Sequence, residues 1–229
     1  MLETLWRITP LGLGAALTPS LLTLQIVASR GAHWIWRTSM VILGTALAFG
    51  GACTIFYLGF AQLPDDPPNG PRIVQGILLL AATVVLAGVA IWLFRPHPEL
   101  VIKSEAAISR RLDKVHLVTI FSIAFVLSVK DITSFALLVP GLHDIATAGI
   151  ATYEEVALVI FMFVLALLPV LLPPAWRAIR GKQAARMLDR LYDFTMRQQF
   201  RIVGILAVVF AIYCLVMSFG KTGLGVAPW

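Results

Sequence analysis

Charged residues and cysteines are scarce in this 229-residue chain, and each scarcity excludes a class of protein. Only 13% of the residues are charged, whereas an ordinary soluble domain carries about 25%. The two cysteines, Cys53 and Cys214, lie far apart, and neither begins a Cys-x-x-Cys redox motif. A Gly-rich phosphate loop is also missing, and the four histidines lack metal-ligand spacing. We therefore expect no enzyme, no cofactor and no metal site.

Long apolar stretches dominate instead. Hydrophobic residues make up 59% of the chain, and its mean hydropathy is +0.88. A membrane-spanning helix needs about 20 apolar residues. Six stretches approach or exceed that length, at about residues 8–28, 39–60, 73–94, 117–139, 156–172 and 202–219. The sequence thus predicts an all-α membrane protein with six transmembrane helices. Because Pro169, Pro173 and Pro174 fall at its far end, we expect the fifth helix to be short or broken there.

The positions of the basic residues predict the orientation. Most of the 18 Lys and Arg residues fall between the first and second, third and fourth, or fifth and sixth stretches. Cytoplasmic loops carry such an excess. This pattern predicts a multi-pass protein of a bacterial inner (plasma) membrane with both termini outside the cytoplasm. It also explains the basic pI without nucleic acid as a partner.

Two short runs repeat along the chain. Arg-Ile-Val at residues 72–74 recurs at 201–203, and Gly-Ile-Leu at 76–78 recurs at 204–206. Because each half would hold three helices, the second half would enter the membrane upside down, which makes an inverted-topology repeat. Chance similarity between apolar helices is the alternative. The predicted units are a first three-helix repeat (1–95), a basic cytoplasmic linker (96–116) and a second three-helix repeat (117–229).

Lys130 and Asp131 are unusual because they lie near the middle of the fourth stretch. A lysine at that depth costs roughly 2.5 to 3.5 kcal/mol on insertion scales. Both side chains are therefore expected to face the interior. There Lys130 could bind an anionic substrate group, while Asp131 tunes or pairs with that charge. A purely structural pair buried against another helix is the alternative.

The first stretch contains a matching irregularity. Gly12 and Gly14 precede the run Thr18-Pro19-Ser20, and a proline inside a helix removes one backbone hydrogen bond. We expect a kink or break there, with the two glycines giving backbone flexibility. Two broken helices that meet at mid-membrane would present backbone and hydroxyl groups to a substrate. An ordinary proline kink with close-packed small residues is the alternative.

These features resemble the small GAP or Sap family, the peptidoglycolipid- and sulfolipid-addressing proteins of the LysE exporter superfamily. The resemblance rests on the six-helix plan, the Gly-x-Gly-Ala-Ala-Leu-Thr-Pro-Ser run at 12–20, and Ser128 with Lys130 in the fourth helix. The family usually has Asn-Pro-Lys at the latter position, so this chain keeps the lysine and lacks the proline. The resemblance implies the export of glycolipids or related envelope lipids.

The predicted function is therefore an exporter or flippase for an amphipathic, anionic envelope lipid. Its predicted substrate site contains Thr18, Pro19, Ser20, Ser128, Lys130 and Asp131. Two alternatives stay open, namely a small amino-acid or cation exporter of LysE type and a non-transporting scaffold for a larger lipid pump. The expected partners are membrane lipids and the lipid substrate, and association with a lipid-export or lipid-synthesis complex or into a homo-oligomer is left open.

A basic segment at 176–201 adds a second expected lipid contact. Apolar residues recur there at helical spacing among basic ones, as in helices that lie on an anionic leaflet. A loop helix that only sets the topology is the alternative. The residues expected at this anionic-lipid interface are Arg177, Arg180, Lys182, Arg186 and Arg190.

Overall fold

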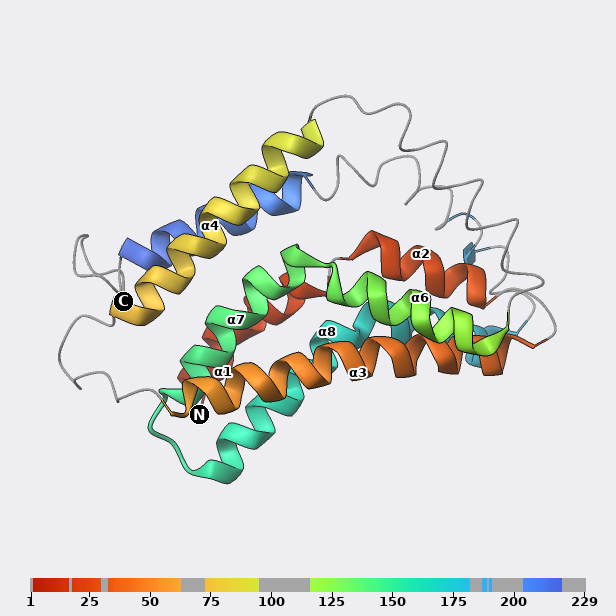
Figure 1. The fold of residues 1–229 in the computed structure, drawn as a ribbon, viewed down its shortest axis with the longest axis horizontal. Helices are drawn as coiled ribbons and strands as arrows, with labels where there is room; N and C mark the ends of the chain where they lie inside the picture. Colours follow the sequence, from red (N-terminus) through yellow and green to blue (C-terminus); the bar gives the residue numbers. More distant parts are fainter. Residues whose placement is uncertain are drawn as a thin grey trace.

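The computed structural model describes residues 2–16, 18–29, 33–62, 73–94, 116–181, 187–188, 190 and 204–219. Its main helices, in chain order, are α1 (Leu2–Ala15), α2 (Pro19–Ala28), α3 (Trp34–Phe60), α4 (Ile73–Phe94), α6 (Leu117–Val129), α7 (Ile132–Ala146), α8 (Thr152–Arg180) and a further helix, Gly204–Phe219 (Figure 1). These ranges contain no strand. The predicted all-α class is confirmed for the part of the chain that is described.

Two long antiparallel helices, α3 and α8, are joined at both of their ends. The guanidinium of Arg177, near the end of α8, lies 4.9 Å from the ring centre of Trp34, the first residue of α3. At the opposite ends, the Tyr57 hydroxyl donates a hydrogen bond of 2.7 Å to Glu155 Oε2. Because the beginning of α3 meets the end of α8, the two helices run in opposite directions.

The pairs α1–α2 and α6–α7 lie along this two-helix frame. Each pair is bent by 63° at a short break. The first half of the first pair, α1, packs on α7 and α8, while α6 packs on α3. Successive passes alternate in direction, so that α1 begins at the end of the molecule where α3 ends (Figure 1).

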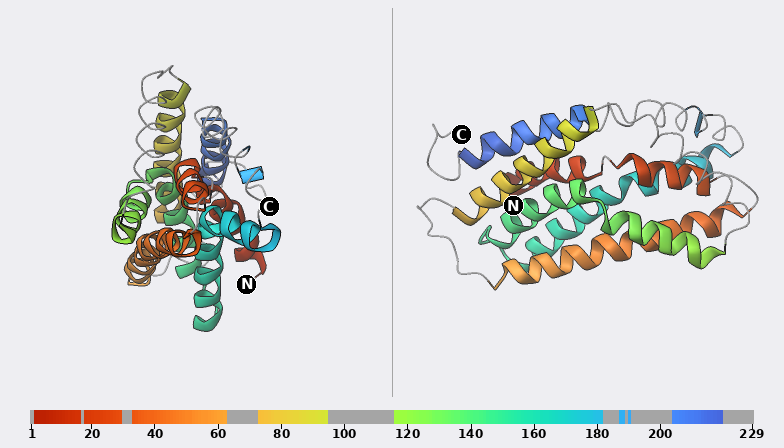
Figure 2. Two further views of the ribbon diagram at one scale, coloured as in Figure 1. Left: turned by 90° about the vertical axis from the view of Figure 1, so that its right-hand side faces the viewer. Right: turned by 45° about the horizontal axis from the view of Figure 1, so that its top comes forward.

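The two remaining helices, α4 and 204–219, lie together on one side of the bundle (Figure 2). They are joined by side-chain hydrogen bonds to backbone carbonyls. Ser218 Oγ donates to the Gly76 carbonyl at 2.9 Å, and Thr83 Oγ1 donates to the Ala211 carbonyl at 3.4 Å. The bounds of α4 are those predicted for the third span. It also packs against α7.

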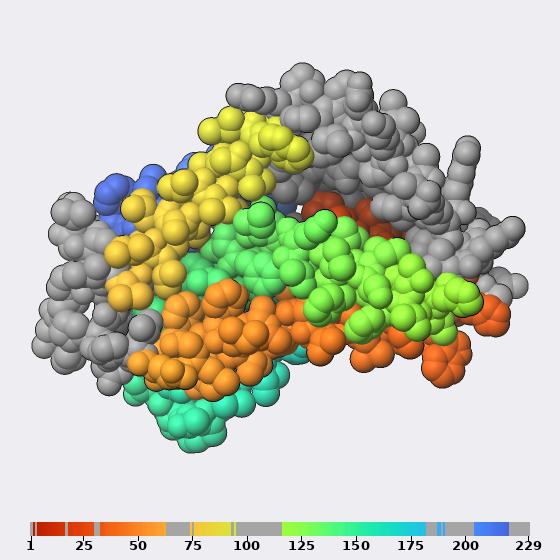
Figure 3. Space-filling model, in the orientation of Figure 1, coloured from red at the N-terminus to blue at the C-terminus, as the bar shows by residue number. Residues whose placement is uncertain are grey.

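Large apolar side chains cover the outside of these helices. Leu43, Ile55, Val84, Ile160 and Ile212 are each more than half exposed, and α3, α4, α6 and α7 share one broad face (Figure 3). Water would penalise such a surface, whereas hydrocarbon chains accommodate it. The apolar helices therefore indicate a membrane protein.

Length and composition identify two to four spans among the described helices. The helices α3 and α8 each qualify, and each bent pair qualifies if it counts as one span. The shorter apolar stretches Gly76–Trp92 and Gly204–Phe219 coincide with the predicted third and sixth spans. The six-helix inverted repeat and the domain limits stay predictions, and residues 96–115 of the linker lie outside the described residues.

The prediction for the fifth span was wrong, because α8 runs from Thr152 through its prolines to Arg180. Pro174 has no N–H for the Val170 carbonyl one turn earlier. The fully buried Gln25 of α2 supplies the missing donor, with its Nε2 2.5 Å from the Val170 oxygen. A side chain from another helix thus replaces a lost helical hydrogen bond.

Candidate functional site

The two helix breaks face each other near the middle of the bundle. In the first pair, Pro19 is the first residue of α2 and Thr18 is its N-cap. Because Pro19 cannot donate, the Ala15 carbonyl loses its helical partner. The predicted break in the first helix is confirmed.

The second break forms without any proline. Lys130 ends α6, and Asp131 is the N-cap of α7. Asp131 Oδ1 accepts hydrogen bonds from the Ser134 backbone N–H at 3.3 Å and from Thr133 Oγ1 at 2.6 Å. A carboxyl oxygen at this position accepts from backbone donors that the start of a helix leaves unpaired. Capping by Asp131 therefore begins a new helix at this point without a proline.

Hydrogen bonds join the two breaks directly. Thr18 Oγ1 lies 2.7 Å from Asp131 Oδ2, so the N-cap of α2 contacts the N-cap of α7. Ser134 Oγ lies 2.5 Å from the same carboxylate oxygen and 2.7 Å from the Ala15 carbonyl oxygen. Thr18 and Ser134 are also 3.1 Å apart. We call Ala15, Thr18, Asp131, Thr133 and Ser134 the break cluster.

Of the predicted substrate residues, the structure brings only Thr18 and Asp131 into this cluster. Lys130, the C-cap of α6, is exposed and makes no contact in the break cluster, so its role in substrate binding stays a prediction. Ser128 is buried and donates to the Ala124 carbonyl of its own helix at 2.8 Å. Ser20 is exposed on α2.

Gly12 and Gly14 lie in the regular part of α1, before the break. A Cβ atom on Gly12 would lie 2.9 Å from Leu165 Cδ1, and one on Gly14 would lie 2.6 Å from the ring of Phe210. The structure thus gives them a role in close helix packing, where the sequence suggested backbone flexibility.

Sequence reasoning missed Ser134, Thr133 and the Ala15 carbonyl. A signal for the first two was present, because Asp131 precedes Thr133 and Ser134 at the spacing of an N-cap aspartate. The signal for Ala15 was its place four residues before Pro19. Their convergence could not be predicted, because it depends on how α1 packs against α7.

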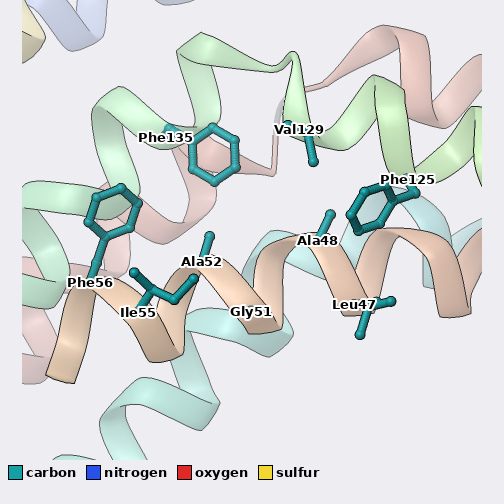
Figure 4. A pocket seen from close by; sticks show the side chains of 9 residues that line it. All are labelled: Leu47, Ala48, Gly51, Ala52, Ile55, Phe56, Phe125, Val129 and Phe135. Atoms are coloured by element: carbon teal, nitrogen blue, oxygen red, sulfur yellow. The ribbon is translucent and has the colours of Figure 1, made fainter. Parts of the chain in front are cut away.

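An apolar groove of about 370 Å³ opens beside the second break. Val129 and Phe135, on either side of the Lys130–Asp131 pair, form part of its wall. Ala48, Gly51 and Ala52 of α3 lie opposite them, between larger side chains (Figure 4). A polar cluster and an apolar groove therefore occur within a few residues of each other.

The basic end of α8 forms aromatic contacts. Arg177 lies over Trp34, and Arg180 lies over Trp176 with 5.4 Å to the ring centre. Such cation–π pairs suit the boundary between lipid and water. Arg190 is exposed, while Lys182 and Arg186 lie outside the described residues.

Comparison with known families gives one match. The sequence profile of the family described as "Sap, sulfolipid-1-addressing protein" matches residues 8–219. No curated protein and no solved structure matches the chain. Among the described residues, no group of three or more His, Cys, Asp or Glu side chains is placed to hold a metal ion.

Proposed function

Because the chain belongs to the Sap, sulfolipid-1-addressing protein, family, we propose that it is an exporter or flippase of an amphipathic, anionic envelope lipid. The family and the apolar helices link the chain to lipid export at a membrane. The transport step, the lipid class and the inner membrane as its location are the proposal.

The observation that carries this proposal is the apolar groove next to the break. A lipid needs an apolar path for its acyl chains and a polar contact for its head group. Val129 and Phe135 line the groove, and Lys130 and Asp131 lie between them in the sequence. The exposed ammonium of Lys130 is available to an anionic head group, while chains occupy the groove against Ala48 and Ala52.

The repeated order of helices supports movement of one half against the other. Each half contains a bent pair, then a long helix (α3 or α8), then a shorter apolar helix. Equal bends of 63° in the two pairs fit two inverted copies. Rocking of such repeats about a central site is a common means of alternating access.

Purified protein in liposomes tests the proposal. The readout is the transfer between leaflets of a fluorescent anionic glycolipid, measured by a quencher that cannot cross the membrane. We expect transfer by the wild type and its loss in Lys130→Met, with unchanged thermal stability. Transfer at the wild-type rate by a well-folded Lys130→Met variant would remove the head-group role.

A matched pair of glycine substitutions tests the groove. A Cβ atom on Gly51 or on Gly59 would meet nothing within 4 Å. Both residues lie in α3, but only Gly51 lines the groove. Gly51→Leu should block lipid transfer and leave folding intact, whereas Gly59→Leu should leave both unchanged. Equal transfer by the two variants would contradict a path through the groove.

A second candidate function is the export of a small amino acid or cation. It is favoured because the ionisable residue of the break cluster is acidic, Asp131, whereas the basic Lys130 is exposed outside the cluster. Liposomes loaded with radiolabelled basic amino acids distinguish the two functions. Amino-acid release without lipid transfer would support this candidate. The absence of both activities would support a scaffold for another pump.

A further inference from the structure

The break cluster has too few hydrogens for its closest contacts. Three short oxygen–oxygen contacts lie in the cluster. Thr18 to Asp131 at 2.7 Å and Ser134 to the Ala15 carbonyl at 2.7 Å join the two breaks, and Ser134 to Asp131 at 2.5 Å lies within the second break. Each such contact needs a hydrogen between its oxygens. The two hydroxyls supply one hydrogen each, and a carbonyl and an ionised carboxylate supply none.

A proton on Asp131 completes the set. Thr18 then donates to Asp131 Oδ2, the protonated Oδ2 donates to Ser134 Oγ, and Ser134 donates to the Ala15 carbonyl. Thr133 and the Ser134 backbone N–H still donate to Oδ1. Three hydrogens thus satisfy all three contacts. They form a continuous series of hydrogen bonds from Thr18 through Asp131 and Ser134 to the Ala15 carbonyl.

We propose that Asp131 is a proton-binding site, and that its proton holds the two helix breaks together. The proton comes from water and binds Oδ2 without any other bond being made or broken. Its release removes one of the three hydrogens and adds a negative charge. The contact between Thr18, Ser134 and Asp131 then weakens, and the two halves can separate.

The surroundings leave Asp131 as the ionisable group of the cluster. Thr18 faces it from the first pair, and Thr133 and Ser134 face it from α7. The helices α2, α4, α6 and 204–219 contain no Asp, Glu, Lys, Arg or His. Lys130 is adjacent in sequence but exposed. Arg7 lies in the middle of α1, eight residues before its end at Ala15. The other such residues of the packed helices lie near helix ends: Glu3, Arg37, His143, Asp144, Glu154, Glu155, Arg177 and Arg180. The proton site depends only on the contacts of the break cluster, whereas its coupling to lipid movement rests on the proposed function.

Infrared difference spectroscopy of the reconstituted full-length protein tests the proton itself. A protonated carboxyl group has a carbonyl stretch that an ionised one lacks. We expect this band in the wild type, its loss at alkaline pH along a single-proton curve, and its absence in Asp131→Asn. Glu154→Gln, a control at a distant carboxyl, should keep the band. A wild type without the band, or an Asp131→Asn variant that retains it, would overturn the proton site.

A second variant covers the case in which Asp131→Asn does not fold. Ser134→Ala removes the acceptor of the carboxyl hydrogen but keeps the carboxyl group. The band should therefore stay and move in frequency, because its hydrogen bond is lost. An unmoved band would contradict the proposed contact between the Asp131 proton and Ser134.

Transport measurements then test the coupling separately. The ratio of proton-bound to proton-free protein changes about tenfold per pH unit for one proton. Lipid transfer by the wild type should follow that curve, and transfer by Asp131→Asn should lose its pH dependence. If the band titrates while no lipid moves, the proposed function fails and the proton site stands. If lipid moves and no band exists, the proton site fails and the proposed function stands.

Discussion

The α1–α2 and α6–α7 pairs bend by the same 63°, yet the chain interrupts the two helices by different chemistry. At the first break Pro19 removes a backbone donor, which leaves the Ala15 carbonyl as a free acceptor. At the second break Asp131 caps α7 with its carboxylate and needs no proline. One break gains an acceptor from the backbone, and the other gains its polar groups from side chains.

This difference makes the breaks complementary. Ser134 of the second pair reaches the Ala15 carbonyl of the first, and Thr18 of the first reaches Asp131 of the second. Two identical proline breaks would each offer a free carbonyl with no hydrogen between them. The two pairs thus have the same bend but different residues at the break.

The largest expected effect comes from removing the second cap. Asp131→Ala should lower the free energy of unfolding by about 2 to 4 kcal/mol, because α7 loses its N-cap and two hydroxyls lose their acceptor. Thermal or denaturant unfolding in detergent measures the loss. Asp131→Asn, which still caps, should lose clearly less, and equal losses would mean that capping does not hold the second break.

A smaller effect should follow from removing the hydrogen bond by which Gln25 of α2 contacts the Val170 carbonyl of α8. Gln25→Leu should cost about 1 kcal/mol, since the Val170 carbonyl loses its donor while the unbonded Gln25 Oε1 is also removed. Pro174→Ala should restore a helical donor to that carbonyl. A double-mutant cycle checks this, because Gln25→Leu should become nearly neutral in the Pro174→Ala background. Strictly additive effects would contradict it.

The smallest effect tests whether the breaks are interchangeable. Ile132 follows the N-cap Asp131 as Pro19 follows Thr18. Proline is favoured at the first position of a helix, but the Ile132 N–H donates a hydrogen bond of 2.9 Å to the Lys130 carbonyl. Ile132→Pro should lower the unfolding free energy by about 0.5 kcal/mol, because the loss of this hydrogen bond is partly offset by the smaller entropy of the unfolded chain. A large loss would show that the second break depends on the Ile132 N–H.

Hydropathy predicted the helices well, because a span needs only enough consecutive apolar residues. The helix α4 has the bounds predicted for a third span, and Pro19 correctly marked the first break. The same proline rule failed in α8, since the donor that replaces the lost N–H comes from Gln25, nearly 150 positions earlier in the chain. Long-range compensation of this kind leaves no local pattern.

The candidate site was predicted only in part. The charge of Asp131 and the hydroxyl of Thr18 were visible in the sequence, but the exposure of Lys130 depends on the rotation of α6 at its last turn. The groove depends on how closely α3 and α6 cross at Gly44, where a Cβ atom would lie 2.6 Å from the Phe121 carbonyl oxygen. Such crossings follow from packing and not from local periodicity.

The two contacts that join the ends of α3 and α8 have a mechanical consequence. Contacts at both ends, Trp34 with Arg177 and Tyr57 with Glu155, oppose sliding of α3 along α8. The 27 and 29 residues of these helices measure roughly 40 Å at 1.5 Å per residue, close to the full thickness of a bilayer with its head groups. If the chain moves lipid as proposed, α3 and α8 would then stay fixed relative to each other while the bent pairs change their angle at Thr18 and Asp131.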